Sequence, residues 1–251
     1  MSHVHGVYPV AGSVVLTPGT ACSSLLHGAD FGIIIGHGLG CTSRLQNRVQ
    51  EQNMSMTVEF YFDFGSPTAY LAYRRLLQFN AAYGLNIDYR PILLGGVFKA
   101  TGNTSPVAVP AKGNYMLEHD LPRFATRYGV DLVFNPYFPL NTLTLMRGAI
   151  ATHRMDCFEH YVNTVYRAIW VEGKNMGDPD VVIEVLNEAE LDTQGILALA
   201  SDDDVKASLI ANTDAAVARG IFGAPTMFLD DEMYFGQDRL DFIEATLKSQ
   251  A

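Results

Sequence analysis

Positive charge and long apolar runs are both scarce in this sequence of 251 residues. Lys and Arg number 17 against 27 Asp and Glu, and the formal net charge of -10 disfavours sequence-independent binding to phosphate backbones or anionic lipid. The best apolar candidate, "FGIIIGHGLG", is interrupted by glycines and by His37, so it is too short to span a bilayer. We therefore expect neither nucleic acid nor membrane among the partners.

Cysteine is also scarce, with three residues in the whole chain: Cys22, Cys41 and Cys157. Their number is odd, they are widely spaced and they form no C-x-x-C, which excludes a disulfide framework or a zinc knuckle. This usage is typical of a reducing compartment, and we expect a soluble cytoplasmic protein.

Regular periodicity is missing from residues 1–55, which are rich in Gly, Ser, His and Thr. We predict a disordered or poorly structured N-terminal extension there. A mitochondrial transit peptide is an alternative because the segment is poor in acids, although only Arg44 and Arg48 are basic. Met54 and Met56 directly precede the first predicted strand, so the folded domain is expected to start at this point.

The remaining chain alternates between strand and helix patterns at both of its ends. Residues 57–63 alternate as a buried strand, residues 67–84 have helical spacing, and "LNIDYRPI" is typical of a second strand. A β-α-β order implies a right-handed crossover and a parallel pair. Near the C-terminus, residues 225–236 predict two short strands joined by an acidic turn, and residues 237–250 predict a final helix.

Between these ends, residues 106–215 are almost entirely helical in pattern. Asp178 before Pro179, and Ser201 with Asp202, are typical of helix starts inside this block. The sequence therefore predicts an α/β fold in which residues 56–105 and 216–251 form a sheet domain and residues 106–215 form an all-helical insertion.

"FDFGSPTAY" places a lone serine, Ser66, where the first strand passes into the first helix. Free N–H groups and the positive end of the helix dipole at such a site favour an anion or a thiolate. A serine followed by Pro67 is equally typical of a simple helix cap. The local pattern leaves both interpretations open.

"GAPT" places Pro225 at the start of a strand, after a loop that contains a glycine. A peptide bond that precedes proline is sometimes cis, and the backbone of Ala224 is expected to stay unpaired. This pattern has little specificity by itself.

Taken together, these features have a specific likeness. A β-α-β start, a helical insertion, a loop that ends in proline, a hairpin and a final helix are similar to the thioredoxin-like architecture of DsbA and of kappa-class glutathione transferases. The words "FYFDFGSPTAYLA", "RPILLGGVFKATGN", "VPAKGNYM", "GIFGAPTMFLD" and "YFGQDRL" resemble the 2-hydroxychromene-2-carboxylate isomerases. The resemblance runs from about Thr57 to the C-terminus.

The resemblance implies a thioredoxin-like fold, a homodimer and glutathione as the cofactor. It further implies that the enzyme interconverts 2-hydroxychromene-2-carboxylate and trans-o-hydroxybenzylidenepyruvate, a small aromatic 2-oxo acid, as in bacterial naphthalene-type catabolism. In that family a serine hydrogen-bonds the glutathione sulfur, and the matching residue is Ser66. The catalytic role of Ser66 rests on this resemblance.

The resemblance also implies a cofactor-binding set. Asn103 and Lys112 are expected to contact the tripeptide, and the backbone of Ala224 before Pro225 is expected to pair with its cysteinyl unit. Taken without the family, Asn103 is a turn residue and Lys112 a solvated loop charge.

At the start of the last predicted helix, Gln237 and Asp238 are expected to hold the γ-glutamyl end of glutathione. An ammonium group needs a carboxylate partner, and a carboxylate needs free N–H groups. The local alternative for Asp238 is a partner of the helix dipole in the first turn.

One further pattern concerns metal binding. His153, Cys157 and His160 are spaced to share one face of a single predicted helix, as three metal ligands would. The same face carries Met146 and Tyr161, so we interpret it as a packed face and predict no metal site.

Two alternative functions remain open. The first is a kappa-like glutathione transferase or peroxidase, and the second is a non-catalytic thioredoxin-like binding module, since no cysteine stands at the position of Ser66. For the substrate carboxylate, the available cations are Lys99, Arg123 and Arg127, among which the sequence does not choose.

Overall fold

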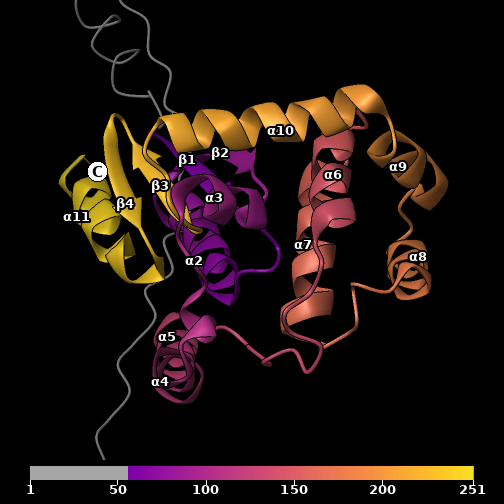
Figure 1. Ribbon diagram of the computed structural model, residues 1–251. Coiled ribbons are helices and arrows are strands. Elements are labelled where there is room, and N and C mark those ends of the chain that lie inside the picture. Colours follow the sequence, from indigo (N-terminus) through magenta and orange to yellow (C-terminus); the bar gives the residue numbers. More distant parts are fainter. Residues whose placement is uncertain (1–55, 251) are drawn as a thin grey trace, which may run out of the picture. The chain divides into compact units, whose positions relative to one another are not determined.

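The computed structural model describes residues 56–250. The predicted N-terminal extension over residues 1–55 lies outside the described part of the chain. The described residues form a mixed sheet in the order β2-β1-β3-β4, in which β1 runs parallel to β2 and antiparallel to β3, and β3 runs antiparallel to β4 (Figure 1). The strands are β1 (Thr57–Phe62), β2 (Asn86–Pro91), β3 (Thr226–Leu229) and β4 (Glu232–Phe235).

Helices fill the chain between and after these strands, as the sequence predicts. This arrangement confirms a sheet domain with a helical insertion. In chain order the helices are α2 (Pro67–Tyr83), α3 (Leu94–Thr101), the 3-10 turn η1 (Pro106–Ala108), α4 (Pro110–Tyr115), the π-helical turn η2 (Met116–Asp120), α5 (Leu121–Tyr128), α6 (Leu143–Thr152), α7 (Phe158–Trp170), α8 (Pro179–Glu188), α9 (Thr193–Ala200), α10 (Asp203–Ala218), the 3-10 turn η3 (Gln237–Arg239) and α11 (Leu240–Gln250).

Strand β1 lies inside the sheet and is covered on both faces. Successive side chains of a strand point to opposite faces, so Phe60 and Phe62 join the larger core while Tyr61 joins a smaller core on the other side. Tyr61 meets Phe228 of β3 edge to face, with ring centroids 5.8 Å apart. This burial on both faces explains why Phe60, Tyr61 and Phe62 follow one another at the end of β1.

The helical insertion shares the larger core with the sheet. Tyr166 and Trp170 of α7 are fully buried, and the Tyr166 ring lies 6.0 Å from that of Phe62 and 4.9 Å from that of Phe64. The long helix α10 packs against α6 and α9 of the insertion and also against α3 and β2 (Figure 1). It ends at Ala218, beyond the predicted boundary at residue 215.

Local signals in the sequence explain where these helices begin. Asp178 and Asp202 cap α8 and α10, because their carboxylates accept hydrogen bonds from the N–H groups of Asp180 and Asp204. Both predicted helix starts are thus confirmed. Within residues 56–250, no helix combines the length and the apolar character that crossing a bilayer requires.

Candidate active site

Ser66 caps helix α2, as the local pattern allows. Its Oγ accepts a hydrogen bond from the Ala69 N–H at 3.1 Å, and Pro67 occupies the first helical position. Pro67 has no N–H to donate, and among the described residues the Thr68 N–H has no hydrogen-bond partner. The helix therefore offers one free donor beside a serine whose exposed fraction is 5%.

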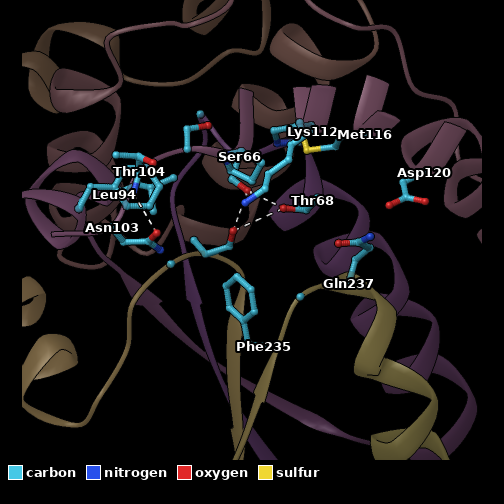
Figure 2. A pocket seen from close by; sticks show the side chains of 18 of the residues that line it. Ser66, Thr68, Leu94, Asn103, Thr104, Lys112, Met116, Asp120, Phe235 and Gln237 are labelled. Atoms are coloured by element: carbon cyan, nitrogen blue, oxygen red, sulfur yellow. Dashed lines mark hydrogen bonds between the residues drawn. The ribbon is translucent and has the colours of Figure 1, made fainter. Parts of the chain in front are cut away.

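The Ser66 hydroxyl also joins two distant parts of the chain. It donates to the Ala224 carbonyl oxygen at 3.0 Å, and Thr68 Oγ1 lies 2.9 Å from Ser66 Oγ and 3.4 Å from the same carbonyl (Figure 2). The expectation that the Ala224 backbone stays unpaired is wrong for its carbonyl, because two hydroxyls of the α2 cap lie within reach of it. The Ala224–Pro225 peptide bond is cis.

A buried carboxylate holds the corner that presents Ser66. Asp63, with 2% exposed surface, accepts hydrogen bonds from the Gly65 N–H at 2.9 Å, the Leu94 N–H at 2.8 Å and the Thr142 hydroxyl at 2.7 Å. Burial raises the pKa of this carboxyl group, and the three hydrogen bonds oppose that rise. Asp63 thus ties the Ser66 corner to α3 and to the insertion.

Two further bonds attach the insertion to the same corner. The Trp170 indole N–H donates to the Phe64 carbonyl at 2.8 Å, and the Phe64 N–H donates to Met146 Sδ at 3.4 Å. Because all of these groups are buried, their hydrogen bonds are costly to break. The helical insertion therefore contributes directly to the geometry of the corner.

A cavity of about 630 Å³ opens above Ser66, with its polar side chains spread over several elements (Figure 2). Nearly all of the residues predicted to bind the cofactor or to act in catalysis line this cavity, although they come from distant parts of the sequence. The residues that do so are Ser66, Asn103, Lys112, Ala224, Gln237 and Asp238, whereas Pro225 is not part of the lining.

Lys112 is the one Lys or Arg residue in the cavity lining. It lies in α4 rather than in a loop, its side chain extends into the cavity in Figure 2, and it forms no ion pair among the described residues. Asp120 and Asp238 are the acidic lining residues, and Asp238 pairs with Arg239. A ligand that carries carboxylates thus meets one available cation.

The cations proposed for the substrate carboxylate lie elsewhere. Lys99, Arg123 and Arg127 are all absent from the cavity lining. Arg127 pairs with Asp241, and Arg123 lies 3.8 Å from Asp120. The cavity lining therefore offers none of these three cations to a substrate carboxylate.

Comparison with known proteins identifies the family. The DSBA-like thioredoxin domain matches residues 57–248. A 2-hydroxychromene-2-carboxylate isomerase of Pseudomonas putida is 36% identical over 194 residues, which cover 76% of this chain and 94% of that protein. The chain belongs to the 2-hydroxychromene-2-carboxylate isomerase family. This is a family of enzymes with the DSBA-like thioredoxin fold. The predicted family and the predicted thioredoxin-like fold are therefore both confirmed.

Other members and relatives agree with this assignment. A solved structure of a 2-hydroxychromene-2-carboxylate isomerase matches with a TM-score of 0.70 and 36% sequence identity, covering 77% of this chain and 95% of that chain. Glutathione S-transferase kappa 1 of Rattus norvegicus is 26% identical over 200 residues, which cover 74% of this chain and 88% of that protein. The predicted kinship between the isomerase family and the kappa transferases is therefore confirmed.

The prediction that His153, Cys157 and His160 share one face of a single helix is wrong. Helix α6 ends at Thr152 and α7 begins at Phe158, so the three residues do not share one helix. His153 instead stacks on the Phe158 ring, with centroids 3.7 Å apart. Among the described residues, no group of three or more His, Cys, Asp or Glu side chains could hold a metal ion.

Some cavity residues were missed at the level of sequence. Thr68 stands two positions after Ser66, and its hydroxyl lies 3.4 Å from the Ala224 carbonyl oxygen, which also accepts from Ser66. Phe222 and Phe235 contact each other with ring centroids 4.5 Å apart. The spacing of Thr68 from the capping serine is a usable signal. The meeting of the two phenylalanines has no local signal, since they come from a loop and from β4.

We predict that Asp63→Asn destabilises the protein by about 1 to 3 kcal/mol, since the amide nitrogen cannot accept from an N–H. This difference in stability between wild type and variant should become smaller as the pH rises. A carboxyl group whose pKa is raised on folding stabilises the protein most below its unfolded pKa of about 3.9, and this contribution is lost as the pH rises through the folded pKa.

Urea unfolding of both proteins across a pH series measures this difference. The stability advantage of the wild type should shrink as the pH rises, and Asp231→Asn in the exposed β3–β4 turn controls for the loss of one charge. An advantage that grows with pH would contradict a raised pKa for Asp63.

Proposed function

We propose that this chain is a glutathione-dependent isomerase that interconverts 2-hydroxychromene-2-carboxylate and trans-o-hydroxybenzylidenepyruvate. The observation that supports it most is the position of Ser66, a hydroxyl donor at the start of α2 in a cavity of about 630 Å³. Curated relatives at 36% and 33% identity are 2-hydroxychromene-2-carboxylate isomerases. With serine in place of cysteine, the site suits binding of an external thiol better than disulfide exchange.

The residues of the cavity fit glutathione in charge and in position. Lys112 is a cation without an ion-pair partner among the described residues and suits the glycyl carboxylate. Asp238 and Gln237 lie in the turn before α11 and suit the γ-glutamyl ammonium and carboxylate. Asn103 donates through Nδ2 to the Phe222 carbonyl at 2.8 Å, so it shapes the loop beside the tripeptide.

Ser66 and the α2 N-terminus suit the sulfur of this cofactor. When bound, glutathione supplies a sulfur nucleophile that adds to the conjugated carbon–carbon double bond of the open-chain acid and leaves once the resulting single bond has rotated. The Ser66 hydroxyl, the positive end of the helix dipole and the Thr68 N–H, which has no partner in the described part of the chain, all favour the anionic form of a thiol placed there.

The aromatic part of the substrate has a matching surface. Phe222 and Phe235 line the cavity, and each is 37% exposed. A Cβ added at Gly223 would lie 2.9 Å from the Phe235 ring, so the glycine allows this ring to lie against the loop. Flat apolar faces of this kind bind a planar aromatic ring through offset or edge-to-face contacts.

We further propose that the enzyme works in the cytoplasm as a homodimer. A reducing compartment supplies glutathione as the thiol, and none of the residues assigned to the site is a cysteine. Among the described residues, β4 is an edge strand of the sheet and Met233 is 40% exposed, so this edge is available to a second chain.

The experiment that tests the proposal follows absorbance as the chromene acid converts to the open-chain acid. Turnover should require glutathione, and the total thiol should stay constant through many turnovers. S-methylglutathione keeps both ends of the tripeptide but has no thiol, so it should bind without supporting turnover.

Two results would contradict the isomerase. Stoichiometric loss of thiol into a conjugate would favour the kappa-like transferase, which the 26% identity to the rat enzyme makes the second candidate. Binding of glutathione without any turnover would favour a non-catalytic binding module.

We predict that Lys112→Ala and Asp238→Ala each weaken glutathione binding by about 1 to 3 kcal/mol, because each removes a charged partner of the tripeptide. Calorimetric titration measures the change. Lys99→Ala and Asp231→Ala are controls of equal charge outside the cavity and should bind as the wild type does. If both cavity variants match the wild type, the assigned ends of the tripeptide are wrong.

We predict that Ser66→Ala slows the chemical step by about 10²-fold to 10³-fold, as loss of an anion-stabilising donor does. It should also cost about 1 kcal/mol of stability, because the α2 cap is lost. Asp178→Ala removes a comparable cap from α8, so it should lower stability without slowing turnover. Equal rates for Ser66→Ala and the wild type would reduce Ser66 to a helix cap.

A further inference from the structure

Three oxygen atoms meet at the floor of the cavity. Ser66 Oγ lies 2.9 Å from Thr68 Oγ1 and 3.0 Å from the Ala224 carbonyl oxygen, and Thr68 Oγ1 lies 3.4 Å from that carbonyl (Figure 2). The Ala69 N–H is also directed at Ser66 Oγ, at 3.1 Å. The group thus contains two hydroxyl protons and one carbonyl acceptor.

The distances favour one arrangement of these two protons. Ser66 donates to the Ala224 carbonyl across the shorter gap, and Thr68 can donate to Ser66 Oγ, which has a second lone pair free beside the Ala69 bond. In this arrangement every acceptor has a donor. The Ser66 proton is, however, already committed to a carbonyl of its own chain.

Serving a thiolate requires the Ser66 hydroxyl to turn away from that carbonyl. Ala224 is only 9% exposed, so its carbonyl would be left buried without this donor. Thr68 is placed to prevent this, since rotation of its hydroxyl directs the proton at the same oxygen. Thr68 can therefore replace Ser66 as the donor to the Ala224 carbonyl, and α2 stays hydrogen-bonded to the Ala224 loop.

We infer that Thr68 is a positioning residue whose hydroxyl takes over the Ala224 carbonyl and so frees the Ser66 hydroxyl to donate to the cofactor sulfur. This inference rests on the proposed function, because it needs a thiol bound at Ser66. Thr68 acts through Ser66 and does not itself need to touch the reacting atoms.

The test compares Thr68→Val, which replaces the hydroxyl by a methyl group of similar size, with Thr68→Ser, which keeps the hydroxyl. Thiolate absorbance of bound glutathione is followed against pH in each variant, alongside kcat and KM for the isomerisation. Thr126→Val is the matched control, because Thr126 lies on the exposed side of α5 and donates to the Pro122 carbonyl.

In Thr68→Val the bound thiol should ionise at higher pH, and kcat should fall about tenfold, less than for loss of the Ser66 donor itself. The dissociation constant of glutathione and the KM should stay within about twofold of the wild type, since neither end of the tripeptide is affected. Thr68→Ser should restore both the thiol titration and kcat. Thr126→Val should match the wild type.

A double variant tests whether Thr68 acts through Ser66. In the Ser66→Ala background, Thr68→Val should cause no further shift in the thiol titration, because the donor that it releases is already gone. An equal shift in both backgrounds would overturn the inference, as would an unchanged titration in Thr68→Val alone. Failure of the wild type to bind glutathione would overturn the proposed function and this inference together.

Discussion

The hydrogen bond from Ser66 Oγ to the Ala224 carbonyl is the contact on which the site depends, because it joins residues 158 positions apart in the chain. It places the N-terminus of α2 against the loop that leads into β3, and the cavity opens above this junction. The two elements come from opposite ends of the described chain, and they are brought together because β1 and β3 are neighbours in the sheet. The sheet therefore positions the two elements, and the Ser66 hydroxyl links them.

The helical insertion fixes this junction from below. Asp63 accepts from Thr142 at the start of α6, and the Trp170 indole of α7 donates to the Phe64 carbonyl. These are buried polar contacts inside an aromatic core, where an unpaired group costs more free energy than a made bond contributes. Such contacts favour one arrangement of the corner over others, and this explains why the sheet domain that carries the candidate site shares a core with its insertion.

Much of the fold follows from local signals in the sequence. Alternation over β1, Pro67 after a capping serine and the aspartate caps of α8 and α10 all act within a few residues, so the sequence predicts them. The break between α6 and α7 was missed because it needs Asp156 at a positive φ of 52°. Periodicity continues across that turn and gives no sign of it.

The site divides along the same line. The motifs shared with the isomerase family predict that Ser66, Lys112 and Asp238 belong to the site. The hydrogen bonds between the Ala224 carbonyl and two hydroxyls could not be predicted, because they depend on tertiary structure. The meeting of Phe222 with Phe235 depends on it equally, since a loop and β4 come together only in the folded sheet.

The central claim is that the sulfur of glutathione lies at the Ser66 hydroxyl, and a crystal structure of the protein with bound glutathione tests it most directly. The account predicts a sulfur within hydrogen-bonding distance of Ser66 Oγ, with Thr68 Oγ1 closer to the Ala224 carbonyl than the present 3.4 Å. A tripeptide bound with its sulfur away from Ser66, and with the Ser66 bond to Ala224 unchanged, would contradict the account.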